Sequence, residues 1–331
     1  MADSILRWGV MSTANIGRAA VNPAIQASSN GTLVAVASRD ATRAADFASL
    51  HGIPRHHGSY EALLEDPDVD AVYIPLPNSM HRDWTIRAAQ AGKHILCEKP
   101  LALSASECLE MQAAAGENNV RLMEAFMYRF HPRTQRVIEM VREGVIGDIR
   151  AIRSAFTFRL TRPDNIRLDA GLGGGALMDV GCYCVNVSRT IAGTEPVEVQ
   201  AFARWADSGV DDQLTGVLRF DDDLTAHFDC SLTTERCEMF EVGGTAGHLR
   251  IPGAFLPGTA DASIHEHRGR NGETEHVVPG ADEYLLMVEH FADAVLSGGA
   301  LHYGAEEAAA NMRTIEALYA SARDGGRPVT L

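Results

Sequence analysis

The sequence predicts an α/β protein of two domains: an N-terminal doubly wound parallel sheet, and a second α+β domain built on a large, mostly antiparallel open sheet. Over the first third of the chain, short apolar runs alternate with amphipathic helical segments, which is typical of β-α-β units. Beyond about residue 195, strand-like runs follow one another directly, separated by turns such as VGGTAG. The length of 331 residues also suits two domains better than one core.

The expected strands of the first domain are short, and several are continuous apolar runs such as LVAVAS, as strands buried on both faces are. Helices are expected between them, and Ser59 and Ser104 precede two of these segments as N-capping residues. The strands are expected at residues 6–11, 33–38, 71–74, 94–97 and 121–125, and the helices at 41–51, 60–64, 82–91 and 105–117.

The regular alternation of strand and helix patterns ends at about Tyr128, and helices and a series of strand patterns follow. Helices are expected at residues 132–142, 174–191, 283–296 and 305–323, and strands at 148–160, 197–205, 213–220, 226–232, 238–242 and 247–251. No flexible Gly/Ser linker occurs near residues 128–131. We therefore expect two domains, 1–128 and 129–331, that pack together with a cleft between them.

Composition restricts the possible partners and the cellular setting. A net charge of −15 would repel polyanions, so neither nucleic acid nor an anionic membrane surface is an expected partner. No signal-peptide pattern opens the sequence and no apolar run approaches the ~20 residues that span a bilayer, so a cytoplasmic protein is expected. The six cysteines form no C-x-x-C pair and the 13 histidines no H-E-x-x-H motif, so we expect reduced thiols and no metal.

The stretch GVMSTANIG follows the first expected strand, where a dinucleotide-binding loop would lie. Ser12 and Ala14 replace the first two glycines of the G-x-G-x-x-G pattern, and only Gly17 is retained. A serine can take the first position if its φ is negative, an alanine at the second adds only a methyl group, and Gly17 keeps the close packing of helix on strand. The hydroxyls of Ser12 and Thr13, the Asn15 amide and the N–H groups of a helix N-terminus would bind a phosphate. The candidate cofactor contacts in this loop are Ser12, Thr13, Ala14, Asn15 and Ile16. By itself the loop is also compatible with an ordinary strand-to-helix turn.

The end of the second expected strand favours NADP over NAD. NAD-binding domains usually carry an acidic residue there for the ribose hydroxyls, whereas this chain has Ser38 followed by Arg39. A hydroxyl and a guanidinium suit the 2′-phosphate of NADP. Two alternatives remain open: Arg39 is an ordinary surface residue, or the adjacent Asp40 pairs with Arg39 or caps the next helix.

Four further motifs carry a family resemblance: VYIPLPNSMH at 72–81, AGKHILCEKPLAL at 91–103, MYRFHP at 127–132 and GGGALMDVGCY at 173–183. Together they resemble the Gfo/Idh/MocA oxidoreductase family, and the match runs in order over nearly the whole chain. Within that family, STANIG, IPLPN, CEKP, NIRL and D-x-G-x-Y are similar to the branch of D-xylose dehydrogenases, dimeric dihydrodiol dehydrogenases and deoxysugar ketoreductases. The resemblance implies a Rossmann domain, a nicotinamide cofactor between the domains, and homodimers or homotetramers formed through the open sheet.

Three residues are the expected catalytic set. Lys99 follows a strand at the carboxyl end of the parallel sheet, where open α/β folds bind ligands. Asp179 and Tyr183 lie one helical turn apart, so their side chains share a face. A nearby ammonium lowers a phenol pKa by roughly 1–3 units, which brings Tyr183 towards general acid/base work. We expect Lys99 to hydrogen-bond the substrate oxygen, and Asp179 to orient either the sugar hydroxyls or the lysine. Members of the family often have this Lys–Pro bond in cis, which the sequence does not reveal for Lys99–Pro100.

The resemblance adds supporting positions around this set. The family uses the segment after the strand expected at 71–74 to cover the ribose and nicotinamide, and places a carboxylate near the nicotinamide ribose. The matching residues are Pro75, Leu76, Asn78, His81 and Glu98. Arg129 is a candidate for the cofactor, with an interdomain ion pair as the alternative, and Arg167 and Asn186 are candidates for the substrate.

The sequence therefore predicts an NADP-dependent oxidoreductase, with NAD as the second choice of cofactor, that acts on a carbinol or carbonyl of a sugar or polyol. An aldose such as D-xylose is the first choice of substrate. The alternatives in the same class are a trans-dihydrodiol dehydrogenase and a ketosugar reductase. More remote alternatives are a glycosidase that retains NAD and a catalytically idle NADP-binding sensor.

Overall fold

The computed structural model describes residues 5–221, 223–269 and 272–331. The chain divides into two compact units, each described separately below. The first comprises Met1–Met127 and Asp282–Ala309, and the second Tyr128–Ala281 and Ala310–Leu331. Helix α8 (Glu283–Ser297), which we expected in the C-terminal domain, belongs to the first unit. The reason is apolar packing: Phe291 of α8 contacts Trp8, with ring centroids 5.2 Å apart.

The first unit is built on a parallel sheet of six strands within the described residues, in the order β3-β2-β1-β4-β5-β6. This is the strand order of a dinucleotide-binding Rossmann sheet. Its central strands are apolar and buried, as the sequence predicted. The strands are β1 (Leu6–Val10), β2 (Gly31–Ala37), β3 (Arg55–His57), β4 (Ala71–Ile74), β5 (His94–Cys97) and β6 (Leu122–Glu124).

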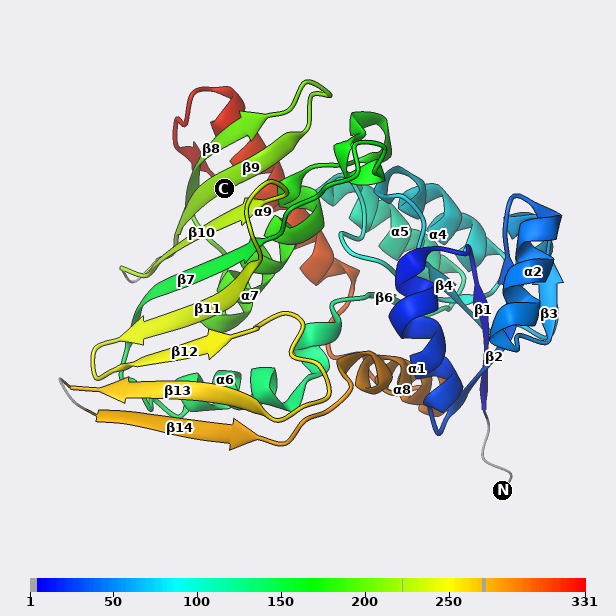
Figure 1. Cartoon of the computed structure of the whole chain (residues 1–331), viewed down its shortest axis with the longest axis horizontal. Helices are drawn as coiled ribbons and strands as arrows, with labels where there is room; N and C mark the ends of the chain where they lie inside the picture. Colours follow the sequence, from blue (N-terminus) through cyan, green and yellow to red (C-terminus); the bar gives the residue numbers. More distant parts are fainter. Residues whose placement is uncertain (1–4, 222, 270–271) are drawn as a thin grey trace. The chain divides into compact units, whose positions relative to one another are not determined.

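Helices connect these strands, and several begin at capping side chains. The carboxylate of Asp40 and the hydroxyls of Ser59 and Ser104 each accept a hydrogen bond from the N–H three residues on. Figure 1 shows α1 beside α8 and α4 beside α5, and these pairs are in contact. The helices are α1 (Asn22–Ala27), α2 (Ala41–His51), α3 (Tyr60–Leu64), α4 (His81–Gln90) and α5 (Ala105–Glu117), together with α8.

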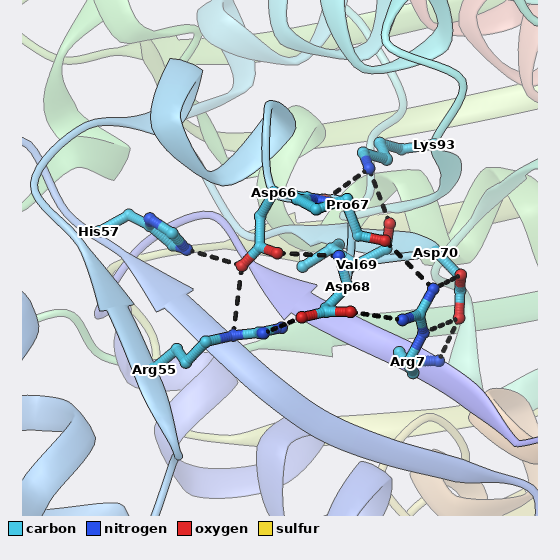
Figure 2. A network of polar contacts seen from close by, with 9 residues as sticks. All are labelled: Arg7, Arg55, His57, Asp66, Pro67, Asp68, Val69, Asp70 and Lys93. Carbon is cyan, nitrogen blue, oxygen red and sulfur yellow. Dashed lines mark hydrogen bonds and ion pairs between the residues drawn. The ribbon is translucent and has the colours of Figure 1, made fainter.

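A polar network ties the amino ends of the parallel strands together (Figure 2). Arg7 of β1 donates through Nε to Asp70 Oδ2 at 2.8 Å, just before β4. The buried Lys93, just before β5, donates through Nζ to the carbonyl oxygens of Asp66 and Val69, both at 2.8 Å. The amino edge of the sheet is therefore occupied by structural contacts, which leaves the carboxyl edge for ligands.

The second unit is built on a nine-stranded sheet within the described residues, in the order β14-β13-β12-β11-β7-β10-β9-β8-β15. Neighbouring strands are antiparallel except β7 and β10, which are parallel. The sequence patterns did not predict β13, β14 or β15. The strands are β7 (Ile149–Thr157), β8 (Glu198–Trp205), β9 (Asp211–Arg219), β10 (Thr225–Ser231), β11 (Cys237–Gly244), β12 (His248–Pro252), β13 (Ala262–Arg268), β14 (Gly272–Val278) and β15 (Val329–Thr330).

Helices cover one face of this sheet: α6 (Pro132–Arg142), α7 (Cys182–Ala192) and α9 (Ala305–Arg323). Buried and exposed residues alternate along β9 and β10, so the opposite face is exposed in the single chain (Figure 1). That exposed face carries apolar side chains, among them Phe202 at 60% and Val217 at 41% exposure. No helix among the described residues is long and apolar enough to cross a membrane.

Candidate functional site

The loop after β1 is fastened to the turn after β4. The Ser12 hydroxyl donates to the carbonyl oxygen of Pro75 at 3.1 Å and accepts from the Ala14 N–H at 3.1 Å. Its φ is +158°, at the edge of the extended region and not at the negative value expected for a serine that replaces the first glycine. The structure also differs from the expectation that this hydroxyl is offered to a phosphate, because its proton is already donated to Pro75.

A helix begins at Asn15 and its first turns run into a π-helical turn, Gly17–Val21, before α1. The first N–H groups of a helix have no acceptor within the helix, so this turn presents donors to an anion. Gly17 is buried, and a Cβ there would lie 3.6 Å from Tyr73 Cε1 and 3.3 Å from Asn22 Oδ1. The distance to Tyr73 is an ordinary van der Waals contact and only the Asn22 side chain is closer, so the role of Gly17 in packing the helix on the strand stays a prediction. The Asn15 amide oxygen accepts from Arg18 Nη2 at 2.5 Å.

The end of β2 fits a 2′-phosphate better than a ribose hydroxyl. Ser38 is buried and its hydroxyl accepts from the Asp40 N–H at 3.3 Å. The Asp40 carboxylate accepts from the Arg43 N–H at 3.0 Å and so caps α2, which is one of the alternatives left open by the sequence. Arg39 is exposed and lies near Tyr60. A hydroxyl and an exposed guanidinium thus end this strand, with the nearest carboxylate engaged as a helix cap.

Glu98 and Lys99 follow β5 at the carboxyl edge of the sheet. Glu98 Oε1 accepts from the Tyr73 hydroxyl of β4 at 2.6 Å, which fixes the carboxylate. Burial, with the neighbouring Glu98, raises the pKa of Tyr73 well above its usual value, so the phenol remains a donor. The Lys99–Pro100 bond is cis and Lys99 is half-buried. Tyr73 is a positioning residue that the sequence analysis missed, because it lies within an apolar strand.

His81 has a different position from the one predicted for a cofactor contact. Its side chain is 0% exposed, and its ring nitrogens face two carbonyl oxygens, Nδ1 to Pro100 at 3.0 Å and Nε2 to Leu76 at 2.9 Å. Burial lowers the pKa of His81. His81 therefore connects the turns after β4 and β5 instead of facing a ligand. Glu124 of β6 also holds the turn after β5, because its carboxylate accepts from the Leu101 N–H at 2.7 Å.

The remaining residues of the β4 turn differ in exposure. Pro75 and Leu76 are buried, and Asn78 is half-buried at the start of a 3₁₀ turn, Asn78–Met80. Of the predicted contacts in this turn, Asn78 thus presents the most accessible polar side chain. Pro75 and Leu76 act through their carbonyl oxygens, which hold Ser12 and His81.

In the second unit, Tyr183 is the second residue of α7 and lies in an aromatic cluster. Its ring is 5% exposed and is surrounded by Phe156, Phe255 and Tyr128 at centroid distances of 5.3, 5.4 and 5.8 Å. Aromatic pairs at these distances are stabilising, so the three rings hold the Tyr183 ring in the cluster. The sequence analysis did not identify these aromatic partners, which lie far from Tyr183 along the chain.

Arg167 and Asp179, predicted from separate motifs, are brought together. Arg167 Nε donates to Asp179 Oδ2 at 2.5 Å, and the guanidinium carbon lies 5.8 Å from the centre of the Phe158 ring. The Asp179 side chain is 14% exposed and that of Arg167 39% exposed. This ion pair offers a carboxylate and several N–H donors that suit the hydroxyl groups of a polyol.

Two predicted site residues of the second unit, Asn186 and Arg129, make hydrogen bonds within the protein. Asn186, expected to reach the sugar, is 0% exposed, and its amide oxygen accepts from the buried Tyr128 hydroxyl at 2.5 Å. It therefore holds Tyr128 in the aromatic cluster in this structure. Arg129 lies half-buried in a 3₁₀ turn, Met127–Phe130, and its carbonyl oxygen accepts from Gln135 Nε2 at 2.5 Å.

Comparison with known proteins covers both units. A family model described as an oxidoreductase family with an NAD-binding Rossmann fold matches residues 6–126, and the GFO/IDH/MocA C-terminal domain matches residues 134–250. D-xylose 1-dehydrogenase (NADP(+)) 2 from Haloferax volcanii is 43% identical over 97% of this chain and 98% of that protein. A trans-1,2-dihydrobenzene-1,2-diol dehydrogenase from Xenopus laevis is 37% identical over 74% of this chain and 75% of its own.

A solved structure has the same fold. KijD10, a 3-ketoreductase from Actinomadura kijaniata in complex with NADP and TDP-benzene, has a TM-score of 0.92 and 32% identity, with 96% of this chain and 98% of that chain covered. Both the parallel and the mostly antiparallel sheet were thus correctly predicted. The chain is an oxidoreductase, and it belongs to the Gfo/Idh/MocA family.

Proposed function

We propose that this NAD(P)-dependent sugar oxidoreductase transfers a hydride between NADP and the anomeric carbon of an aldose, with D-xylose as the first choice. The observation that carries the proposal is the Arg167–Asp179 ion pair near the start of the helix that holds Tyr183. The pair supplies donors and a carboxylate for neighbouring hydroxyls, while the phenol supplies an acid/base. The high identity to a D-xylose 1-dehydrogenase along nearly the whole chain supports the same substrate class.

In the oxidative direction, C1 of the sugar loses a hydride and its hydroxyl oxygen loses a proton, which leaves the carbonyl of a lactone. The bound nicotinamide would accept the hydride. Tyr183 takes up the proton, and Lys99 donates a hydrogen bond to the same substrate oxygen. Asp179 accepts hydrogen bonds from the remaining hydroxyls, and Arg167 fixes its carboxylate.

The cofactor is NADP. Helix N–H groups at Asn15 and Ile16 bind the pyrophosphate, and Ser38 and Arg39 bind the 2′-phosphate. The cap between Asp40 and Arg43 supports this assignment, because it engages the nearest carboxylate. Thr13, Ala14, Asn78 and Glu98 complete the proposed cofactor contacts in the first unit.

The proposal includes a homodimer or homotetramer formed through the exposed face of the nine-stranded sheet. Soluble monomers rarely leave apolar side chains such as Phe202 and Val217 on a broad open sheet. Pairing of two such faces would bury these side chains.

A second candidate is reduction of a ketosugar or oxidation of a trans-dihydrodiol, supported by the similarities to KijD10 and to the dihydrodiol dehydrogenase. A panel of aldoses, inositols and diols, each with NAD⁺ and NADP⁺ and followed at the absorbance of the reduced nicotinamide, separates the candidates. We expect D-xylose with NADP⁺ to give the highest kcat/KM, and Lys99→Met to abolish the reaction. A diol as the best substrate would favour the second candidate. Equal turnover by Lys99→Met would contradict the assigned role of Lys99.

A further inference from the structure

Asp211 is a buried carboxylate that joins three elements of the second unit. It is the first residue of β9 and is 1% exposed. Its Oδ2 accepts from the Leu177 N–H at 2.7 Å, and its Oδ1 accepts from the Tyr319 hydroxyl of α9 at 2.6 Å. Asp211 therefore binds the first N–H of the π-helical turn Leu177–Gly181, which carries Asp179 and leads into α7.

A glycine turn lies between this carboxylate and the loop of Arg167. The Gly175 N–H donates to the Arg167 carbonyl oxygen at 2.9 Å, and the Asp179 N–H donates to the Gly175 carbonyl oxygen at 3.0 Å. Gly175 has φ +126°, and a Cβ there would lie 2.2 Å from Asp211 Oδ1 and 2.9 Å from the Tyr319 hydroxyl. Only glycine fits this close approach.

The contacts form a continuous chain from Tyr319 to the Arg167–Asp179 pair. Tyr319 orients the Asp211 carboxylate, the carboxylate fixes the Leu177 N–H and limits Gly175, and Gly175 bonds to both the Arg167 loop and Asp179. A displaced Asp211 would therefore change the position of both partners of the ion pair at once. Neither Asp211 nor Tyr319 is part of a local sequence pattern that indicates this.

We propose that Asp211 and Tyr319 are positioning residues that set the geometry of the Arg167–Asp179 pair for sugar binding. The inference rests on the proposed function, because it takes that pair as the partner of the sugar hydroxyls. Neither residue contacts substrate or cofactor in this account, and their effect passes through Leu177 and the glycine turn.

Asp211 and Tyr319 also make sugar binding depend on pH. Burial raises the pKa of Asp211 to about 6, partly offset by the hydrogen bonds from Tyr319 and Leu177. The other ionisable groups around it are Asp212 on its own strand and Cys230 on β10, with Arg323 of α9 next to Tyr319. The ionised carboxylate accepts from both donors. Once protonated, its hydroxyl oxygen becomes a donor, so the bond with Tyr319 must reverse, and both contacts lose the strength that the negative charge gave them.

Steady-state kinetics with D-xylose and NADP⁺ between pH 5 and 9 test the proposal on Asp211→Asn and Tyr319→Phe. In the natural protein, we expect KM for the sugar to rise roughly tenfold as the pH falls through about 6, while KM for NADP⁺ stays constant. Asp211→Asn should have the raised sugar KM at every pH, with no dependence in this range. Tyr319→Phe should move the transition to higher pH, because it removes a bond that lowers the carboxyl pKa.

Asp212→Asn is the matched control, since it removes the adjacent carboxylate, whose partner is Arg204. It should keep the transition in sugar KM, moved slightly to lower pH, because the Asp212 charge makes a small contribution to the raised pKa of Asp211. Two results together would show a general structural role and overturn the proposal. Asp211→Asn would raise KM for the sugar and for NADP⁺ equally at all pH values, and Tyr319→Phe would leave the pH of the transition unchanged.

Hydrogen exchange over residues 173–183 gives a readout that does not depend on turnover. We expect faster exchange there in Asp211→Asn and Tyr319→Phe than in Asp212→Asn at pH 8. Unchanged exchange in both variants would overturn the positioning role. If no aldose is turned over by the natural protein, the proposed function fails, and the exchange comparison still decides whether Asp211 fixes this segment.

Discussion

In Tyr183 the ring makes the packing contacts, whereas the proposed chemistry belongs to the hydroxyl. Its ring packs against Phe156, Phe255 and Tyr128, and these contacts do not require the hydroxyl. Tyr183→Phe should therefore fold normally, while kcat falls by about 10²- to 10⁴-fold because a general acid/base is lost. The measurement is kcat and both KM values at pH 8. Tyr128→Phe removes a hydroxyl from the neighbouring ring and should keep kcat within about tenfold. A Tyr183→Phe enzyme with normal kcat would exclude the proposed proton transfer.

Arg39 should decide the choice between the two nicotinamide cofactors. Loss of a charge-assisted hydrogen bond to a phosphate costs about 1.5–3 kcal/mol, so Arg39→Ala should raise KM for NADP⁺ by roughly 10- to 100-fold and leave KM for NAD⁺ unchanged. Arg43→Ala, one turn further along α2, is the control and should have little effect. An equal rise in KM for NADP⁺ and for NAD⁺ would contradict a contact between Arg39 and the 2′-phosphate.

Single residues also show where sequence reasoning reaches its limit. Lys99, Asp179 and Tyr183 were identified because each motif places them at a strand end or on a helix face. The same motifs could not show that His81 and Asn186 are fully buried and bonded within the protein. Two of their partners, Pro100 and Tyr128, come from other motifs, and a motif does not reveal which polar atoms such long-range contacts occupy.

At the scale of elements, both helices that carry site residues begin with a π-helical turn, Gly17–Val21 before α1 and Leu177–Gly181 before α7. Such turns occur frequently at functional sites, because they shift side chains relative to a regular helix. The sequence predicted the helix at 174–191 and a helix N-terminus after the first strand, but neither irregular turn, since hydrophobic periodicity over a single turn does not distinguish the two geometries.

Helix α6 makes stability depend on pH through its N-cap. His131 is 0% exposed and its Nδ1 accepts from the Arg133 N–H at 3.0 Å, so the ring must be unprotonated there. Burial and the nearby Arg133 lower the pKa of His131 from 6.5 to about 4. A histidine with a lowered folded-state pKa contributes stability above the unfolded value, and this stability is lost as the pH falls from about 6.5 towards 4.

His131→Asn keeps a cap acceptor and removes this titration. We expect the free energy of urea unfolding of the natural protein to fall by about 2 kcal/mol more between pH 7 and pH 5 than that of His131→Asn. Identical pH dependence in the two proteins would show that His131 does not titrate in this range.

The elements missed by the sequence analysis share a physical feature. β3 is the polar edge segment Arg55–His57. β13 carries the polar residues His265, Glu266 and His267 in succession, so it lacks the alternation of apolar and polar residues that identifies a half-buried strand. Glu266 is 7% exposed, and its carboxylate accepts from His276 of β14 at 2.8 Å. Such strands are stabilised by pairing with neighbouring strands, and a pattern that rests on apolar burial cannot identify them. The apolar strands β1, β2, β4 and β5 were predicted to within about two residues.

At the scale of the whole molecule, the exposed face of the nine-stranded sheet is the proposed contact between subunits. Val217 lies on that face in β9, and an arginine there would place a buried, unpaired charge in the interface. Val217→Arg should therefore convert the assembly to monomers, measured as molar mass by light scattering after size exclusion. Leu50→Arg, an equally drastic change at the exposed Leu50 of α2, should keep the natural mass. A natural protein that is monomeric throughout would contradict the proposed assembly.

The most direct test of the central claim follows the hydride itself. D-xylose that carries deuterium at C1 is incubated with NADP⁺ and the protein, and the reduced cofactor is analysed by mass spectrometry and NMR. The account predicts one deuterium per NADPH at C4 of the nicotinamide ring, together with the lactone or its acid. NADPH without deuterium, or no reduction of NADP⁺ by this aldose, would contradict hydride transfer from the anomeric carbon.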